Sequence, residues 1–307
     1  MEISVAICTY NRADRLTLSL ESLCQQTLTF DDFEILVIDN ASSDRTPQVC
    51  TEYQSSLPNL KYIYEPVRGL SKARNTACQQ AQGKYIAYLD DDAIACPIWL
   101  ETILQVFKNI QPTPIGMGGA IYPLWEIPKP EWMHKYMEDL FTVLDYGDRP
   151  RWFESDKFPY GANMTYQRPA LLAVGGFSEN LGRKGQNLLS EEEHLLNLQL
   201  QNQGGKFYYH PQAAVEHWIP KERINPNWLV RRSYWQGRSV AMVNQLLGTP
   251  LPQLRWESFQ KLVHWMNWKR AIAQLWPNQK VRIWTRIWLY WHWGYFYQIW
   301  FNLPPKQ

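Results

Sequence analysis

The first half of the chain alternates short apolar runs with longer segments of helical periodicity. The apolar runs are rich in β-branched and aromatic residues, as buried strands are, and lie at 3–8, 34–38, 60–64 and 85–89. Between them, 14–26 and 70–82 repeat apolar residues at helical spacing. A further helix is expected to begin near Ser43 and Asp44, whose side chains suit an N-cap. This alternation predicts a doubly wound, Rossmann-like α/β sheet that is mixed but mainly parallel.

After Trp99 the pattern becomes less regular. Residues 123–159 are rich in proline and aromatic side chains, and we expect them to form an irregular segment that faces a substrate. The regular elements expected in this half are strands at 116–121, 206–209 and 213–215 and a helix at 190–203. Glu216 and His217 follow the last of these strands.

Charge and tryptophan are distributed unevenly along the 307 residues. The formal net charge is +2, yet from Ile219 onward there are 13 Lys and Arg against 2 Asp and Glu. The same region contains most of the tryptophans, with 9 of the 16 between Trp256 and Trp300. A basic, tryptophan-rich tail on an acidic body indicates an anionic partner, either a membrane surface or a nucleic acid.

The end of this tail has the composition of a membrane-associated helix. Residues 287–303 contain no charged side chain, and five basic residues precede them: Lys269, Arg270, Lys280, Arg282 and Arg286. The run is at the lower length limit for a spanning helix, and its Trp and Tyr side chains prefer the headgroup interface. We therefore interpret it as an interfacial anchor on an anionic cytoplasmic leaflet. The alternative is that these aromatics pack onto the rest of the chain or onto a partner subunit.

The N-terminus and the cysteines indicate a cytoplasmic protein. The chain enters a strand-like run at Ile3 without a basic leader, so no signal peptide is expected. Its five cysteines show no CxxC spacing, which favours reduced thiols over disulfides or a zinc site.

Polar side chains gather where three of the predicted strands end. They are Thr9 to Arg12, Asp39 with Asn40, and the triplet Asp90, Asp91 and Asp92. Ligands of a parallel sheet bind beyond the carboxyl ends of its strands, so we expect these groups to line one crevice. Three adjacent carboxylates repel one another unless solvent or a cation neutralises them. The triplet is therefore either a site for Mg²⁺ or Mn²⁺ and the phosphates of a substrate, or a solvated acidic loop.

Several protein classes lack their signature here. A nicotinamide dehydrogenase needs a GxGxxG turn after the first strand, and Thr9 to Arg12 contains no glycine. A Mg²⁺ phosphatase with an aspartyl nucleophile carries its acidic motif at the first strand, whereas this triplet follows the fourth. Acidic groups at the predicted crevice also argue against nucleic acid as the ligand.

The ordered motifs of residues 1–220 resemble those of the family 2 glycosyltransferases with the GT-A fold, and are similar overall to bacterial and cyanobacterial exopolysaccharide transferases. The motifs are VAICTYNR at 5–12, VIDNASSD at 37–44, GLSKARN at 69–75, YLDDD at 88–92, GGF at 175–177 and SEEEHL at 190–195, followed by His217. The resemblance implies a nucleotide-sugar-binding half at 1–100 and an acceptor-binding and catalytic half of the same domain at 101–218. Residues 219–307 would then form a basic, tryptophan-rich helical extension.

The resemblance also implies roles for residues that precede the triplet. Thr9, Tyr10 and Arg12 would hold the nucleotide base, and Asp39 would accept hydrogen bonds from the edge of a uracil. Arg74 would offer its charge to the nucleotide or the pyrophosphate, unless it is an ordinary exposed arginine on a helix.

Within the triplet, the alternation of a strand sends neighbouring side chains to opposite sides, so the three carboxylates cannot share one task. By the family pattern, Asp91 would bind the ribose hydroxyls and Asp90 would give support. Asp92 would coordinate the Mn²⁺ or Mg²⁺ that bridges the pyrophosphate. His217 would be a further metal ligand, or else a structural histidine.

The acidic run Glu191-Glu192-Glu193 supplies the candidate general base. We favour Glu192 as the base and Glu191 as an acceptor-binding or orienting group, although glutamates at a helix start are also stabilised by the helix dipole. The resemblance implies an inverting transfer of one sugar from a nucleotide-diphosphate donor, a UDP-sugar, to a hydroxyl of a glycan or lipid-linked acceptor in surface polysaccharide synthesis. The alternative is a degenerate GT-A-fold protein that acts as a membrane scaffold or only binds nucleotide sugars.

Overall fold

The computed structural model describes residues 1–265 and 277–302, which form two compact units. We define the N-terminal unit as Met1–Leu124, Thr142–Glu179 and Glu193–Trp218. The C-terminal unit comprises Trp125–Phe141, Asn180–Glu192 and the chain from Ile219 onward. The extension expected at 219–307 falls in the C-terminal unit, and its residues 266–276 and 303–307, which include Lys269 and Arg270, lie outside the described part of the chain.

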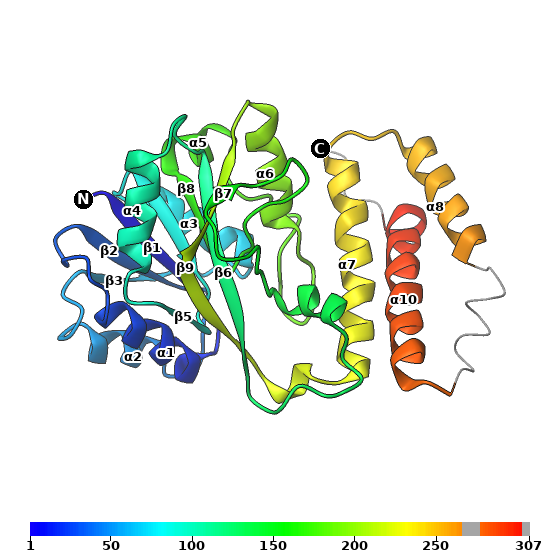
Figure 1. Cartoon of the computed structure of the whole chain (residues 1–307), viewed down its shortest axis with the longest axis horizontal. Helices are drawn as coiled ribbons and strands as arrows, with labels where there is room; N and C mark the ends of the chain where they lie inside the picture. The colour runs from blue at the N-terminus through cyan, green and yellow to red at the C-terminus, as the bar shows by residue number, and fades with distance from the viewer. Residues whose placement is uncertain (266–276, 303–307) are drawn as a thin grey trace. The chain divides into compact units, whose positions relative to one another are not determined.

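One nine-stranded sheet organises the N-terminal unit (Figure 1). Its strands are β1 Ile3–Thr9, β2 Phe33–Asp39, β3 Leu60–Tyr64, β4 Tyr85–Leu89, β5 Ala93–Ala95, β6 Gly116–Trp125, β7 Arg151–Trp152, β8 Asn163–Gln167 and β9 Phe207–Ile219. They lie in the order β3-β2-β1-β4-β8-β6-β9-β5, with β7 paired to β9. The strands β1 to β4 are mutually parallel, and β8 adds to β4 in the antiparallel sense. The parallel half agrees with the predicted α/β alternation.

Helices cover both faces of this sheet. Successive residues of a strand point to opposite faces, and apolar residues lie on both of them. They are α1 Ala13–Cys24, α2 Thr46–Tyr53, α3 Leu70–Gln80, α4 Trp99–Asn109, α5 Arg168–Ala173 and α6 Glu192–Asn202. Ile3, Val5 and Ile7 of β1 belong to the buried cluster with α1, α2 and α4. Ala6, between them, faces the opposite cluster with α3, α5 and α6. The sheet is therefore doubly wound, as predicted.

Two of the expected local boundaries were wrong. The second helix was expected to open near Ser43 and Asp44 with one of them as its N-cap, but it begins at Thr46 with Arg45 at the N-cap. The Asp44 carboxylate accepts from the Thr46 amide (3.1 Å) and also from the Ala13 amide that opens α1 (2.9 Å). The two short strands expected at 206–209 and 213–215 are one strand, β9, which continues to Ile219. Its antiparallel pairing with β5 extends the ladder beyond the expected end.

A buried carboxylate joins the strands β1, β2 and β3 near the opposite end of the strands from the Asp triplet. Glu34 accepts hydrogen bonds from Ser4 Oγ (2.6 Å), the Gln82 amide (2.7 Å) and Lys61 Nζ (2.8 Å). Burial opposes ionisation of Glu34, but these donors outweigh it and hold the pKa of the carboxyl below its usual value. Glu34 is therefore a charged group that stabilises the folded state.

Replacing Glu34 with glutamine should lower the free energy of unfolding by about 1.5–3 kcal/mol at neutral pH, since hydrogen bonds to a charged group are lost. Folding lowers the pKa of Glu34, so its contribution is present above the unfolded pKa of about 4.3 and disappears as the pH falls through the folded value. Urea denaturation of wild type, Glu34→Gln and the exposed control Asp31→Asn, repeated at falling pH, measures this. A wild-type advantage over Glu34→Gln that persists in acid would contradict the assignment.

Three helices make up most of the described part of the C-terminal unit: α7 Pro226–Leu246, α8 Leu251–Trp265 and α10 Gln279–Phe301. Two short 3₁₀ helices, η1 Lys135–Phe141 and η2 Lys221–Arg223, also belong to it. α7 and α10 run in the same direction (Figure 1). Their backbones meet at Gly237, where a Cβ would overlap the Trp291 carbonyl, and at Gly294, where a Cβ would overlap the Tyr234 carbonyl. Only glycine permits this approach.

The tail residues predicted to be an anchor are therefore partly packed and partly exposed. Tyr295 and Ile299 of α10 are buried against α7 and α8, whereas Trp293 is 43% exposed and Trp300 40%. In the described ranges 1–265 and 277–302, no helix combines the length and the hydropathy that a bilayer crossing requires.

Candidate active site

The ends of β1, β2 and β4 bring the predicted polar groups to one edge of the sheet. Thr9 pairs in register with Asp39, and the Asp triplet directly follows β4 on the other side of β1. Thr9 Oγ1 donates to Asp91 Oδ2 at 2.8 Å, across 82 residues of sequence. The parallel order β2-β1-β4 is what makes these three strand ends neighbours.

Arg12 joins two of the three aspartates. Its Nη1 donates to Asp91 Oδ1 and its Nη2 to Asp92 Oδ2, each at 2.5 Å. Both carboxylates are almost fully buried. Burial raises the pKa of Asp91 to about 6, with Arg12 opposing that rise and the nearby Asp92 adding to it. The Arg12 guanidinium thus pairs with two aspartates of the triplet, a contact that the sequence did not indicate, and its expected role toward the nucleotide base stays a prediction.

Asp90, Asp92 and His217 form a cluster suited to a divalent metal ion. One ligand atom from each lies within 4.8 Å of the others, and His217 Nε2 is 3.3 Å from Asp92 Oδ1. His217 was expected to follow a strand, but it lies within β9, opposite Ala93 of β5. Because Ala93 follows the triplet directly, this pairing holds the imidazole beside Asp92. Two carboxylates and an imidazole are donors that Mn²⁺ and related ions accept, so the residues fit the predicted metal.

Arg74 lies inside the site, so the reading of it as an exposed helical arginine was wrong. Its side chain is 4% exposed, and Nη2 is 3.5 Å from Asp90 Oδ1. A Cβ at Gly161 would lie 2.8 Å from that same Nη2 and 3.5 Å from Glu193 Oε1. Arg74 and Glu193 therefore flank Gly161, and Glu193 is the member of the glutamate run that belongs to the N-terminal unit.

Tyr10 and Asp39 have partners that the sequence did not indicate. The Arg68 guanidinium lies over the Tyr10 ring, 4.7 Å from its centroid. Asp39 is fully buried, and its carboxylate accepts from the Ser42 amide (2.8 Å) and from Tyr62 Oη (2.7 Å). Arg68 and Tyr62 were missed because nothing in the local pattern links them to a strand end; only the position of Arg68 directly before the motif at 69–75 could have pointed to it.

Glu191 and Glu192 belong to the C-terminal unit, where α7 supports their loop. Glu191 has a positive φ of 73° and accepts a short hydrogen bond from Gln236 Nε2. Ser190 Oγ donates to Gln236 Oε1 at 3.0 Å, and the Ser190 amide donates to Ser239 Oγ at 3.0 Å. Glu192 is buried and begins α6, one residue past the strained position. Gln236 is a supporting residue that the sequence did not indicate.

The family model described as glycosyl transferase family 2 matches residues 4–174, more than half of the chain. The chain therefore belongs to this family and is a glycosyltransferase. Among curated proteins it is 29% identical over 251 residues to the glucosyl-dolichyl phosphate glucuronosyltransferase of Haloferax volcanii, covering 80% of this chain and 78% of that one. It is 24% identical over 246 residues to the succinoglycan biosynthesis protein ExoM of Rhizobium meliloti, covering 78% and 74%.

A solved structure shows that the fold is shared. The mannosyltransferase of Pyrobaculum calidifontis, solved in complex with GDP-Man and Mn²⁺, matches with a TM-score of 0.61 at 19% identity. The match covers 97% of this chain and 87% of that one. The expected GT-A-type fold with a helical, aromatic-rich C-terminal region is thus confirmed.

Proposed function

We propose that this glycosyltransferase is an inverting, metal-dependent enzyme that moves one sugar from a UDP-sugar to a hydroxyl group of a lipid-linked or glycan acceptor. The observation that carries the proposal is the cluster of Asp90, Asp92 and His217 beside the ends of β1 and β2. These strand ends are where ligands of an α/β sheet bind. The alternative, a degenerate protein that acts as a membrane scaffold or only binds nucleotide sugars, would transfer no sugar.

On the donor side, Asp92 and His217 would hold Mn²⁺ or Mg²⁺, with Asp90 in support. When bound, the ion supplies charge stabilisation for the departing diphosphate. Arg74 lies beside Asp90 and can add positive charge at the same place. Asp91 is assigned to the ribose.

The nucleotide base is assigned to Thr9, Tyr10, Arg12 and Asp39 at the ends of β1 and β2. The Tyr10 ring with Arg68 against it offers an aromatic and cationic surface of the kind that stacks on a base. Asp39 is assigned to the edge of the uracil.

On the acceptor side, Glu192 is the proposed general base, with Glu191 as the residue that binds or orients the acceptor. The first residue of a helix lies in the positive field of the helix dipole, which favours an ionised carboxylate, the form that a base needs. Attack assisted by a single base on the donor carbon inverts its configuration.

We further propose that the enzyme works at the inner face of the cell membrane in surface polysaccharide synthesis, with the aromatic, basic C-terminal region on an anionic lipid surface. Support comes from the exposed tryptophans of α10 and from the relatives, one named for glucosyl-dolichyl phosphate and one for succinoglycan biosynthesis.

Release of nucleotide from a panel of UDP-sugars, with GDP-mannose as the comparison donor, tests the proposal. We expect release from at least one UDP-sugar, loss of release on removal of divalent metal with EDTA, and recovery on adding Mn²⁺. A scaffold would release nothing from any donor. Release from GDP-mannose alone would overturn the assignment of UDP, and release that is insensitive to EDTA would overturn the metal.

A further inference from the structure

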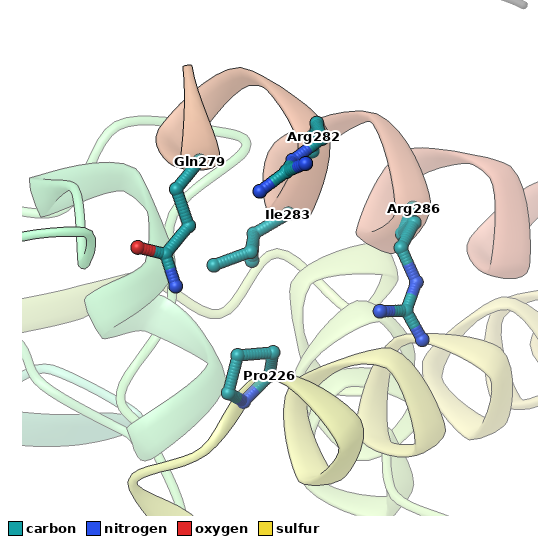
Figure 2. A pocket seen from close by; sticks show the side chains of 5 residues that line it. All are labelled: Pro226, Gln279, Arg282, Ile283 and Arg286. Atoms are coloured by element: carbon teal, nitrogen blue, oxygen red, sulfur yellow. The ribbon is translucent and has the colours of Figure 1, made fainter. Parts of the chain in front are cut away.

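A basic pocket lies where α7 and α10 begin, entirely within the C-terminal unit. It has a volume of about 320 Å³ and is lined by Pro226, Gln279, Arg282, Ile283 and Arg286. Figure 2 shows Gln279 and Ile283 extending from α10 toward Pro226 at the start of α7, and Arg286 extending toward α7 to one side of Pro226, with Arg282 alongside. Two arginines thus face one hollow.

The surroundings of this pocket add positive charge to that of the arginines. α7 and α10 run in the same direction, so their positive N-terminal ends lie together. Neither helix has an acidic residue in its first turn. The two acidic residues of the sequence after 219, Glu222 and Glu257, are not among the lining residues. Among the described residues, no carboxylate forms an ion pair with Arg282 or Arg286, and Arg286 is placed by a hydrogen bond to Asn227 Oδ1 (3.4 Å). A bound anion would offset the repulsion between these positive charges.

The same side of α10 continues from the arginines into an aromatic strip. Arg282, Arg286, Trp293, Phe296 and Trp300 follow the spacing of one helical face. Phe296 stacks on Trp293 at 5.8 Å and on Trp300 at 5.5 Å, and both tryptophans remain two-fifths exposed. At 1.5 Å per residue, the strip ends roughly 20 Å beyond Arg286. One face therefore joins a cationic pocket to an exposed apolar surface.

We propose that this pocket binds the phosphate group of a phosphorylated lipid, whose apolar chain lies along the aromatic strip. Two guanidinium groups can hold a phosphate through paired hydrogen bonds, and Trp side chains favour the interface between headgroups and acyl chains. The inference rests on the proposed function, which places the C-terminal region on a lipid surface, and it names the site and the headgroup chemistry.

Co-sedimentation of the full chain with phosphatidylcholine vesicles containing phosphatidic acid tests the site. We expect binding that is absent with phosphatidylcholine alone and weaker with vesicles containing oleate, an anionic lipid without phosphate. Arg286→Gln should weaken binding by about tenfold or more, because it removes hydrogen bonds to a charged group. Lys280→Gln, which removes the same charge from the exposed first turn of α10 outside the pocket, should weaken it by less than about fivefold. Equal losses in the two variants, or equal binding to oleate vesicles, would overturn the proposal.

Two further measurements separate the possible sources of failure. Soluble glycerol phosphate should compete only weakly with the phosphatidic acid vesicles for the protein. If glycerol phosphate binds as tightly as the lipid does, the pocket is a site for a soluble phosphate and the lipid assignment is overturned. Asp92→Ala should bind the vesicles as wild type does. If the wild-type protein releases nucleotide but does not bind the vesicles, only the lipid-phosphate site is rejected. If it binds the vesicles but releases no nucleotide, only the proposed function is rejected. Circular dichroism of each variant confirms folding.

Discussion

Asp92→Ala should abolish measurable sugar transfer, with a loss of at least about a thousandfold in kcat/KM, because metal stabilisation of the leaving diphosphate is worth several kcal/mol. Asp92 is buried between Arg12 and His217, so its loss removes a ligand from the centre of the cluster and not from its rim. Asp90 is one-third exposed, and water can take the place of its carboxylate. We therefore expect Asp90→Ala to cost only about 10–100-fold.

The measurement is nucleotide release together with Mn²⁺ binding by calorimetry, which reads the site without turnover. Asp14→Ala is the matched control, since Asp14 is an exposed aspartate near the start of α1 whose carboxylate pairs with the exposed Arg45, away from the triplet. It should behave as wild type in both assays. If Asp92→Ala binds Mn²⁺ as tightly as wild type, Asp92 is not a metal ligand and the roles assigned to the three aspartates are wrong.

Glu192→Gln should lower kcat by about a hundredfold to ten-thousandfold while leaving donor binding unchanged, because it removes the proposed base and preserves the shape of the side chain. Glu191→Gln should act mainly on the KM for the acceptor. Glu193→Gln, which changes the residue beside Gly161 and Arg74, should lower kcat by less than about tenfold if Glu193 takes no proton.

The three variants also settle the register of the acidic run. A large loss of kcat in Glu193→Gln with a small one in Glu192→Gln would move the base by one residue. Gln236→Leu gives an independent check, because Gln236 holds the Glu191 loop from α7. Loss of its hydrogen bonds should raise the KM for the acceptor without changing donor affinity, whereas a purely structural role would show only in the melting temperature.

Much of the fold could be predicted because the relevant signals are local. The strands β3 and β4 have the same limits as the apolar runs at 60–64 and 85–89. β4 is buried along its whole length, so no exposed polar position blurs its limits. The errors arose where distant segments decide a boundary. Asp44 serves the starts of two helices, and β9 continues past Val215 because β5 pairs with it.

The candidate site shows the same division. The strand-end positions of Thr9, Asp39 and the triplet follow from the βα alternation, and their common edge follows from parallel pairing. The burial of Arg74 could not be predicted from the periodicity of α3. The residues that cover its side chain include Phe177 and Gly161, which are about 90 to 100 residues away along the chain.

By itself, the sequence determined the class of protein: an α/β sheet with polar residues at three strand ends and an acidic run further along, in the order of one glycosyltransferase family. Only the tertiary structure decided which of these side chains lie together. It placed His217 beside Asp92, Arg12 across two aspartates and two arginines around a pocket between α7 and α10. The physical reason is that periodicity along a strand or helix sets the side on which a residue lies, whereas charge pairing and burial depend on what packs against that side.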